Sequence, residues 1–229
     1  MSEAINGDMS LRAMADTARM QWTPSPSGSV CRKRVHLVGP PESGQVTSVV
    51  RYEPHARFPT HDHPEGEEIF VLEGVFSDEH GNWPAGTFLL NPEGFRHTPF
   101  STPGCLLFVK LRQFAGRERR HLVIDTDRLP WEPSSIPAVA YKALYQQSGF
   151  SDLIRLERWE PQADLGVIAY EQGGEVFVLE GEFADEAGAY STGSWLRLPA
   201  GSMHHPRSAG GCTLYIKRSG LPYLRSTAA

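Results

Sequence analysis

Long apolar runs and dense charge of one sign are both lacking in this sequence. No run approaches the roughly 20 apolar residues that a transmembrane helix needs, so no membrane partner is expected. The net charge is -5 without a dense basic stripe, which argues against nucleic-acid binding. The first twenty residues lack the charged start and apolar core of a secretory signal, and we therefore expect a cytoplasmic protein.

Cysteine is scarce. Cys31, Cys105 and Cys212 form an odd and sparse set without a Cys-x-x-Cys pair, which excludes a disulfide framework and a thiolate zinc site of that type. Cys105 and Cys212 lie 107 residues apart, each at the head of an apolar run. This matched placement predicts two buried strand residues rather than reactive thiols.

Long helical periodicity is also missing, apart from a short stretch from Leu11 to Met20. Short apolar or β-branched segments recur instead, bounded by turns rich in the chain's 22 glycines and 18 prolines. The sequence therefore predicts an all-β protein built of barrels or sandwiches. The expected strands span residues 46–51, 68–73, 87–90, 106–111, 153–158, 176–180, 195–198 and 213–217.

The chain contains an internal repeat. The sequence Phe-Val-Leu-Glu-Gly at residues 70–74 recurs at residues 177–181, an offset of 107. The same offset carries Gly86, Pro92, Gly94 and His97 onto a second set of identical residues. A repeat of this length indicates two copies of one domain. We expect an extension at residues 1–20, a first barrel at 21–120 and a second at 121–229.

Four candidate metal ligands gather in the first copy. His61 and His63 are two residues apart, so on a strand both imidazoles point to one face. Glu67 follows a Pro-Glu-Gly bend, and His97 can return on a neighbouring strand. Three imidazoles and a carboxylate at this spacing predict one divalent metal ion. Zinc is the first expectation, with iron, manganese and nickel as alternatives.

The spacing of these residues resembles the two signature motifs of the cupin superfamily. The first half reads His-x-His-x3-Glu-x6-Gly from His61, and the second reads Gly-x5-Pro-x-Gly-x2-His from Gly86. Two positions depart from the usual pattern, namely His55 in place of a glycine and Ser101 in place of an asparagine. The resemblance implies two tandem cupin (double-stranded β-helix, jelly-roll) barrels.

The chain is further similar to the ChrR-type cupin family, over about residues 21–112 and more weakly over 131–220. The segments that carry the resemblance include Phe-Pro-Thr-His-Asp-His at residues 58–63 and Pro-Ala-Gly-Thr-Phe-Leu-Leu-Asn-Pro at residues 84–92. The family's namesake is a zinc-dependent anti-sigma factor of the bacterial singlet-oxygen response, and its metal ligands map onto His61, His63, Glu67 and His97. Its helical amino-terminal zinc motif, His-x3-Cys-x2-Cys, has no counterpart here, so direct sigma-factor binding is not expected.

The second copy has lost most of the ligand set. The offset of 107 places Ile168, Tyr170, Gly174 and His204 at the four ligand positions, and a single imidazole does not hold a metal tightly. We therefore expect a metal-free second barrel. Its polar and aromatic residues either form a pocket for a small ligand or fill the barrel. The candidate lining is Tyr170, Arg197, His204 and Tyr215.

Three functions remain open at this point. The family resemblance favours a sensor or regulatory protein of oxidative stress that binds a small molecule at the metal. A mononuclear metal-dependent dioxygenase or hydrolase is the alternative, since an octahedral ion with four protein ligands keeps two further positions. A structural or storage-type bicupin, with assembly into a homo-oligomer, is the third. The candidate residues around the first-barrel ligand pocket are His55, Phe70, Phe88 and Phe108.

Overall fold

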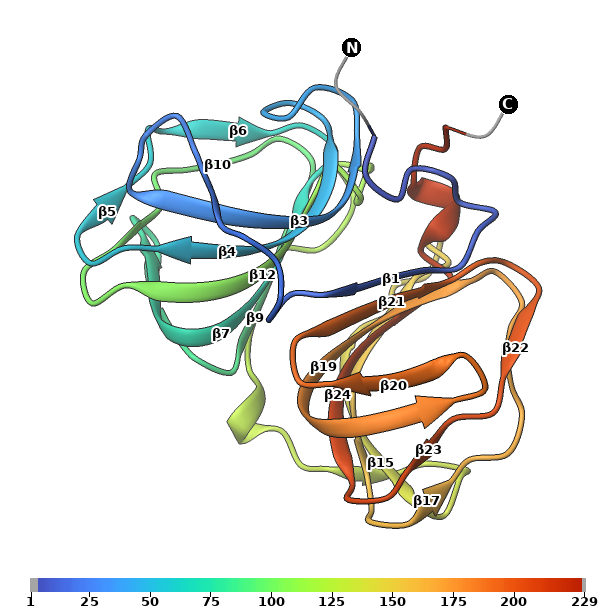
Figure 1. Cartoon of the computed structure of the whole chain (residues 1–229). Helices are drawn as coiled ribbons and strands as arrows, with labels where there is room; N and C mark the ends of the chain where they lie inside the picture. Colours follow the sequence, from blue (N-terminus) through green and yellow to red (C-terminus); the bar gives the residue numbers. More distant parts are fainter. Residues whose placement is uncertain (1–3, 228–229) are drawn as a thin grey trace. The chain divides into compact units, whose positions relative to one another are not determined.

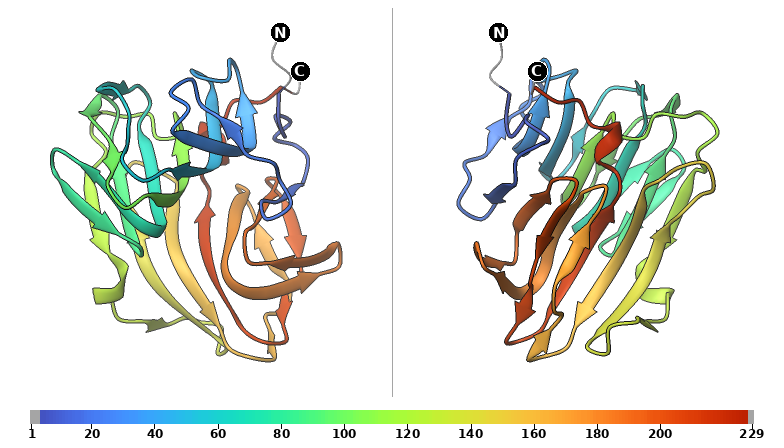
Figure 2. Two further views of the ribbon diagram at one scale, coloured as in Figure 1. Left: turned by 60° about the vertical axis from the view of Figure 1, so that its left-hand side comes forward. Right: turned by 90° about the vertical axis from the view of Figure 1, so that its right-hand side faces the viewer.

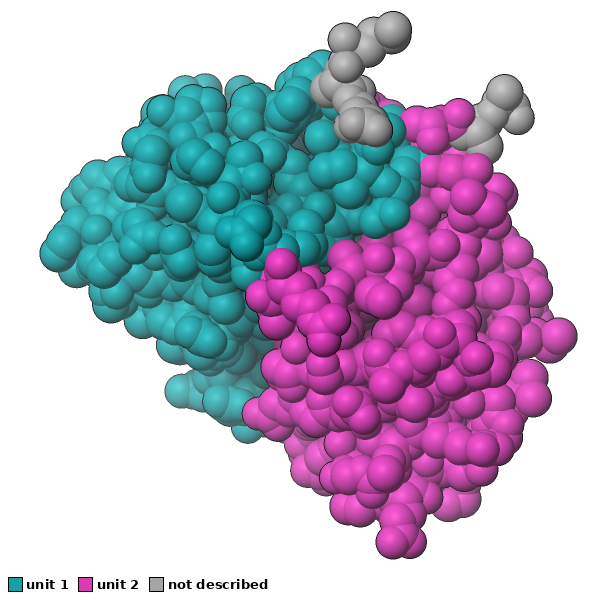
Figure 3. All heavy atoms as spheres, viewed as in Figure 1, with its two compact units in different colours: residues 1–7, 20–128 teal, residues 8–19, 129–229 magenta. Residues whose placement is uncertain are grey.

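A computed structural model describes residues 4–227 of the chain (Figure 1). The chain forms two compact units, coloured separately in Figure 3. Unit 1 comprises residues 1–7 and 20–128, and unit 2 comprises residues 8–19 and 129–229. Nearly all regular structure in the described part is β-strand, and none of its helices is long and apolar enough to cross a membrane.

Unit 1 is a β-barrel of antiparallel strands. A ten-stranded sheet runs in the order β13-β9-β7-β12-β4-β3-β2 with shorter strands attached, and β6 pairs with β10 in a separate ribbon. Its elements are β2 (Thr23–Pro24), β3 (Val30–Val38), β4 (Gln45–Tyr52), β5 (Ala56–Arg57), β6 (His61–His63), β7 (Glu67–Asp78), β8 (Gly81–Pro84), β9 (Thr87–Asn91), β10 (Phe95–His97), β11 (Phe100–Ser101), β12 (Cys105–Leu111), β13 (Leu122–Asp125) and the 3-10 turn η1 (Thr126–Arg128).

Unit 2 repeats this plan. Its ten-stranded sheet runs β1-β21-β19-β24-β16-β15-β14, and β18 pairs with β22 in a separate ribbon. Figure 2 shows its long strands, yellow to red, side by side. Its elements are β1 (Ala13–Asp16), β14 (Glu132–Pro133), β15 (Val139–Tyr145), β16 (Leu153–Trp159), β17 (Ala163–Asp164), β18 (Ile168–Tyr170), β19 (Gly174–Asp185), β20 (Gly188–Ser191), β21 (Ser194–Leu198), β22 (Ser202–His204), β23 (Arg207–Ser208), β24 (Cys212–Arg218) and the 3-10 turn η2 (Leu221–Tyr223).

The predicted all-β architecture with two repeated barrels is confirmed. Every expected strand falls within an observed one, and the alternation of the sequence decides which side chains enter each core. Cys105 and Cys212 are both buried in these cores, as their apolar surroundings predict. Burial raises the pKa of Cys105 to about 11 and that of Cys212 to about 12, which keeps both thiols protonated.

The repeated glycine that closes Phe-Val-Leu-Glu-Gly has a steric reason. Gly74 has φ 73°, and a Cβ at this position would lie 2.1 Å from the carbonyl oxygen of Gly104. Gly181 has φ 74°, and its Cβ would lie 2.3 Å from the oxygen of Gly211. Only glycine adopts this conformation with so close a backbone neighbour. Both barrels therefore need glycine at the same bend.

The segment before the first barrel is a strand and not a helix. Ala13–Asp16 forms β1 and pairs with β21 in the sheet of unit 2 (Figure 1). Residues 8–19, which we expected in an extension, thus belong to unit 2. Likewise β13 pairs with β9 in unit 1, beyond the expected boundary at residue 120. Pairing with an otherwise open sheet edge overrides the weak helical pattern of this stretch.

Candidate metal centre

The three candidate histidines lie on two paired strands. His61 and His63 begin and end β6, and His97 ends β10. The two strands are antiparallel, with His97 opposite His61 and Phe95 opposite His63. Because alternate residues of a strand share a face, His61 and His63 point the same way, and their cross-strand neighbour His97 joins them.

The geometry of this group suits a metal ion. The ligand atoms of His61, His63 and His97 all lie within 4.8 Å of one another. The Nε2 atoms of His63 and His97 are 2.9 Å apart. Two donors bound to one ion at about 2.0–2.1 Å lie about 3 Å apart, so the observed spacing matches a shared metal. The His61, His63 and His97 triad can hold one.

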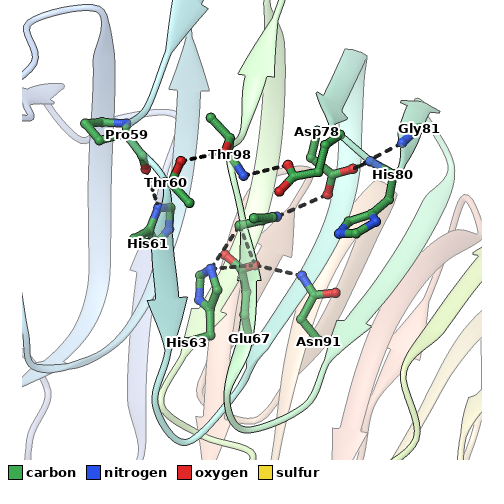
Figure 4. A network of polar contacts seen from close by, with 12 residues as sticks. Pro59, Thr60, His61, His63, Glu67, Asp78, His80, Gly81, Asn91 and Thr98 are labelled. Carbon is green, nitrogen blue, oxygen red and sulfur yellow. Dashed lines mark hydrogen bonds and ion pairs between the residues drawn. The ribbon is translucent and has the colours of Figure 1, made fainter.

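Glu67, the first residue of β7, points its carboxylate at the same group (Figure 4). Its Oε2 atom lies 3.4 Å from Nε2 of His63 and 3.6 Å from Nε2 of His97. The Asn91 side chain on β9 donates a hydrogen bond of 2.9 Å to the same oxygen. Glu67 is buried, and this amide holds its carboxylate in one orientation.

Two of the imidazoles are oriented by hydrogen bonds at Nδ1, the ring nitrogen that does not face the metal position. The Nδ1 atom of His97 donates to a carboxylate oxygen of Asp78 at 3.1 Å, and that of His61 donates to the carbonyl oxygen of Pro59 at 2.8 Å. Each bond fixes the tautomer whose Nε2 carries a lone pair. Asp78 itself accepts a hydrogen bond from the backbone N–H of His80. Such outer contacts are characteristic of metal-ligating histidines.

The protonation of the imidazoles is uneven. Burial lowers the pKa of His63 to about 4, so this ring is neutral at physiological pH. Burial also opposes charge on His97, but the hydrogen bond to Asp78 and the nearby Glu67 carboxylate outweigh it and raise the pKa of His97. A metal binds neutral imidazole, so a proton on Nε2 of His97 would compete with the metal for that nitrogen.

A cavity of about 170 Å³ opens beside these ligands in unit 1. Most of its wall is apolar and comes from the inward faces of β3, β4, β7 and β12. Its polar lining lies on β3, on the loop before β4, within β4, on β6, at the start of β7 and after β12. The charged and imidazole residues of the lining are Arg32, Arg34, Glu42, His61, Asp62, His63, Glu67 and Arg112.

The structure does not bring the other expected pocket residues to this cavity. His55 is exposed at a turn, with φ 64°, between β4 and β5. Phe70, Phe88 and Phe108 are buried, but none lines the cavity. Their neighbours Ile69, Leu89 and Leu107 enter the barrel core instead, so strand alternation turns the three phenylalanines to the opposite face of the sheet.

The corresponding position in unit 2 is filled by packing. Tyr170 replaces His63 and lies in the core, where its ring meets that of His204 edge-on at a centroid distance of 5.4 Å. The expected lining does not converge here. Arg197 and Tyr215 alternate with the core residues Leu196, Leu198, Leu214 and Ile216, so they occupy the other face of the sheet.

The sequence did not predict that arginines line the cavity. Arg32 and Arg34 alternate with Val30 along β3, a spacing that places all three on the inward face. This alternation is visible in the sequence, but an arginine on a strand usually faces solvent. Arg112 follows β12 in a left-handed conformation, which no local pattern announces.

Comparison with known proteins agrees with this fold. The model of the ChrR Cupin-like domain matches residues 10–115 and again residues 119–222. The chain belongs to the ChrR cupin-like family. The first match includes β1, which pairs in unit 2, although the rest of that match lies mostly in unit 1. The second match includes β13, which pairs in unit 1, although the rest of that match lies mostly in unit 2. No curated protein is similar enough to count as a relative.

Solved structures with this fold include several bicupins. A putative dioxygenase from Nostoc punctiforme aligns with a TM-score of 0.72 and 16% identity, covering 90% of this chain and 82% of its own. The pirin YhhW from Escherichia coli, in complex with nickel(II), gives 0.67 and 15%, covering 91% and 98%. An oxalate decarboxylase from Bacillus subtilis with Mn(II) centres gives 0.61 and 12%, covering 90% and 77%. At these identities the similarity concerns the fold alone.

Proposed function

We propose that this ChrR cupin-like protein is a mononuclear metal-dependent enzyme whose chemistry takes place in the cavity of unit 1. One observation carries the proposal, namely that His61, His63 and Glu67 line a cavity of about 170 Å³ instead of being packed on all sides. Structural metal sites are closed by protein ligands, whereas catalytic sites keep a position open for substrate. Dioxygenase is the first candidate reaction and hydrolase the second.

The ligand set supports this assignment. Four donors, the imidazoles of His61, His63 and His97 with the Glu67 carboxylate, leave two positions on a six-coordinate ion. Such an ion would polarise substrate oxygens as a Lewis acid and, if redox-active, provide a place for O₂. Relatives in fold are described as a putative dioxygenase, a nickel(II) complex and a protein with Mn(II) centres, which favours a redox-active ion over zinc.

The protein's own groups have separate tasks in this scheme. Asp78 holds the His97 ring through Nδ1, and Asn91 holds the Glu67 carboxylate, so the donors are in place before a metal arrives. The apolar wall of the cavity excludes water from the reacting atoms. Glu67 also lines the cavity beside the imidazoles, where its carboxylate can accept a proton from substrate.

A regulatory protein of the oxidative-stress response is the second candidate, and family membership is the observation that favours it. It would use the same metal and cavity to bind a small molecule without converting it. The two functions therefore differ in turnover and not in binding.

The test is oxygen consumption by protein reloaded separately with Fe²⁺, Mn²⁺, Ni²⁺ or Zn²⁺, against a panel of small carbonyl compounds and their esters. The dioxygenase proposal expects multiple turnovers with a redox-active ion, abolished in His63→Ala and retained in the unit 2 control His204→Ala. Ester hydrolysis that persists without oxygen would select the hydrolase. Ligand binding without turnover of any panel member, with any of the four ions, would favour the regulatory protein.

A further inference from the structure

The cavity carries a cluster of charges that metal binding alone does not explain. Arg32 and Arg34 stand two residues apart on β3 and both line the cavity. Their side chains are only 17% and 11% exposed, which is unusual for arginine. Desolvation costs a buried guanidinium a good deal of free energy unless an anion compensates it. The site is therefore built to hold an anion.

In this structure the anion is the carboxylate of Glu42. One oxygen of Glu42 accepts from Arg32 Nη1 at 2.6 Å, and the other accepts from Arg34 Nη2 at 2.9 Å. Glu42 sits on the short loop between β3 and β4 and is itself 47% exposed. A half-exposed carboxylate thus holds two mostly buried guanidinium groups, and each of its oxygens contacts a different arginine.

Charge balance points the same way. The lining contains three arginines and three carboxylates, so its formal charges sum to zero when the histidines are counted as neutral. A divalent metal ion adds two positive charges that no lining residue compensates. A cavity with surplus positive charge and little water favours an anionic ligand.

The volume limits the size of that ligand. A cavity of about 150 Å³ accommodates a benzene-sized molecule, so 170 Å³ suits an anion of roughly six to ten non-hydrogen atoms. Much of the lining is apolar and includes Val50, Ile69 and Leu107.

We propose that the cavity binds a small carboxylate and that Arg32 and Arg34 recognise its carboxylate group. The carboxylate of Glu42 occupies the binding position of that group until the ligand displaces it. A carboxylate fits because its two oxygens match the two-armed contact that Glu42 now makes. Glu42 is a positioning residue that keeps the arginines paired while the cavity lacks its ligand. The identity of the substrate class rests on the enzyme proposed above, but the binding itself does not require turnover.

The experiment is calorimetric titration of the full-length protein, metal-loaded and metal-free, with malonate, succinate and acetoacetate. Malonamide is the matched neutral probe, and inorganic phosphate is the non-planar anionic probe. The proposal expects at least one of the three carboxylates to bind more tightly than malonamide and phosphate. Arg32→Gln and Arg34→Gln should each weaken that binding about ten- to hundred-fold, as expected for loss of a charge-assisted hydrogen bond. Arg117→Gln, which removes an exposed guanidinium near Glu93, is the control and should leave it unchanged.

The variant Glu42→Gln distinguishes two roles for Glu42, either a carboxylate that the ligand displaces or a permanent part of the binding site. Displacement predicts several-fold tighter carboxylate binding in this variant, because the competing charge is gone. Weaker or unchanged carboxylate binding by Glu42→Gln, or equal binding of malonate, malonamide and phosphate by the wild type, would overturn the inference. Carboxylate binding by a protein that holds no metal or turns nothing over would contradict the enzyme proposal and leave this one standing.

Discussion

Asp185 accepts a hydrogen bond of 2.9 Å from Nδ1 of His204 in unit 2. Asp78 and His97, 107 residues earlier, make the same contact in unit 1. Unit 2 has therefore kept the outer aspartate–histidine pair, although Ile168, Tyr170 and Gly174 occupy the other ligand positions. This conservation of a contact within one chain makes the two barrels controls for each other.

In unit 2 the carboxylate of the pair has found another partner. Arg12, from the segment before β1, donates to Asp185 and to the Tyr190 hydroxyl. Burial opposes the charge on Asp185, but the hydrogen bonds from His204 and Arg12 outweigh it and lower the pKa of Asp185. Burial lowers the pKa of His204 despite this carboxylate, so the ring is neutral near pH 7. In unit 2 the pair is thus embedded in packing contacts and in a charge-compensating bond to Arg12.

Replacement of the two aspartates should separate these roles. Asp78→Asn leaves His97 without its carboxylate acceptor and should weaken metal affinity about ten- to hundred-fold. Asp185→Asn should leave metal affinity unchanged and lower the thermal stability of the protein, because Arg12 loses its ion pair. Competition with a chromophoric chelator and thermal unfolding give the two readouts. Equal loss of metal affinity in both variants would contradict the assignment of the centre to unit 1.

The pKa of His63 predicts a pH dependence for the metal-free protein. The folded-state pKa of about 4 lies below the ordinary value of 6.5. The unfolded chain therefore binds more protons between these values, and the free energy of unfolding should rise from pH 4 to pH 6.5 by up to about 3 kcal/mol. Below the folded pKa this contribution is lost, and above pH 6.5 it is fully present. His97, whose pKa is raised, acts in the opposite direction.

Denaturant unfolding of metal-free wild type and of His63→Gln at several pH values isolates the contribution of His63. The difference in unfolding free energy between the two proteins should shift in favour of the wild type as the pH rises through this window. A difference that is independent of pH would mean that the His63 ring is not desolvated as its burial indicates.

The edge strands provide a second matched pair. Thr17, after β1, donates its hydroxyl to the Gly193 oxygen at 2.7 Å, and Thr126, after β13, donates to the Gly86 oxygen at 2.6 Å. Thr17→Val and Thr126→Val keep the side-chain shape and should each cost about 1 kcal/mol of stability. Chemical denaturation measures both. A cost for only one variant would contradict the equivalence of the two edges.

Much of the fold followed from the sequence because its strongest signals are local. The period of strand alternation placed Ile69 and Leu107 in a core, and the repeat of 107 residues placed a second barrel. The ligand histidines were found because His61 and His63 sit two apart on one strand. Short-range spacing is what a sequence shows directly.

What the sequence reasoning missed depends on pairing between distant segments. The motif Asp-Thr-x-Arg at residues 16–19 recurs at residues 125–128, and both aspartates form i,i+3 ion pairs with the arginines. This second repeat, with an offset of 109 instead of 107, marks the two edge strands. The pocket phenylalanines were misplaced for a related reason, since both faces of their sheet are buried and alternation alone does not say which face holds the cavity.

The most direct test of the account is metal content per chain, measured by plasma mass spectrometry on protein purified without a histidine tag. Wild type, His61→Ala and His204→Ala should be compared. A single site at His61, His63 and His97 predicts about one divalent ion in wild type and in His204→Ala and almost none in His61→Ala. Two ions per chain, or an ion that persists in His61→Ala and disappears in His204→Ala, would contradict it.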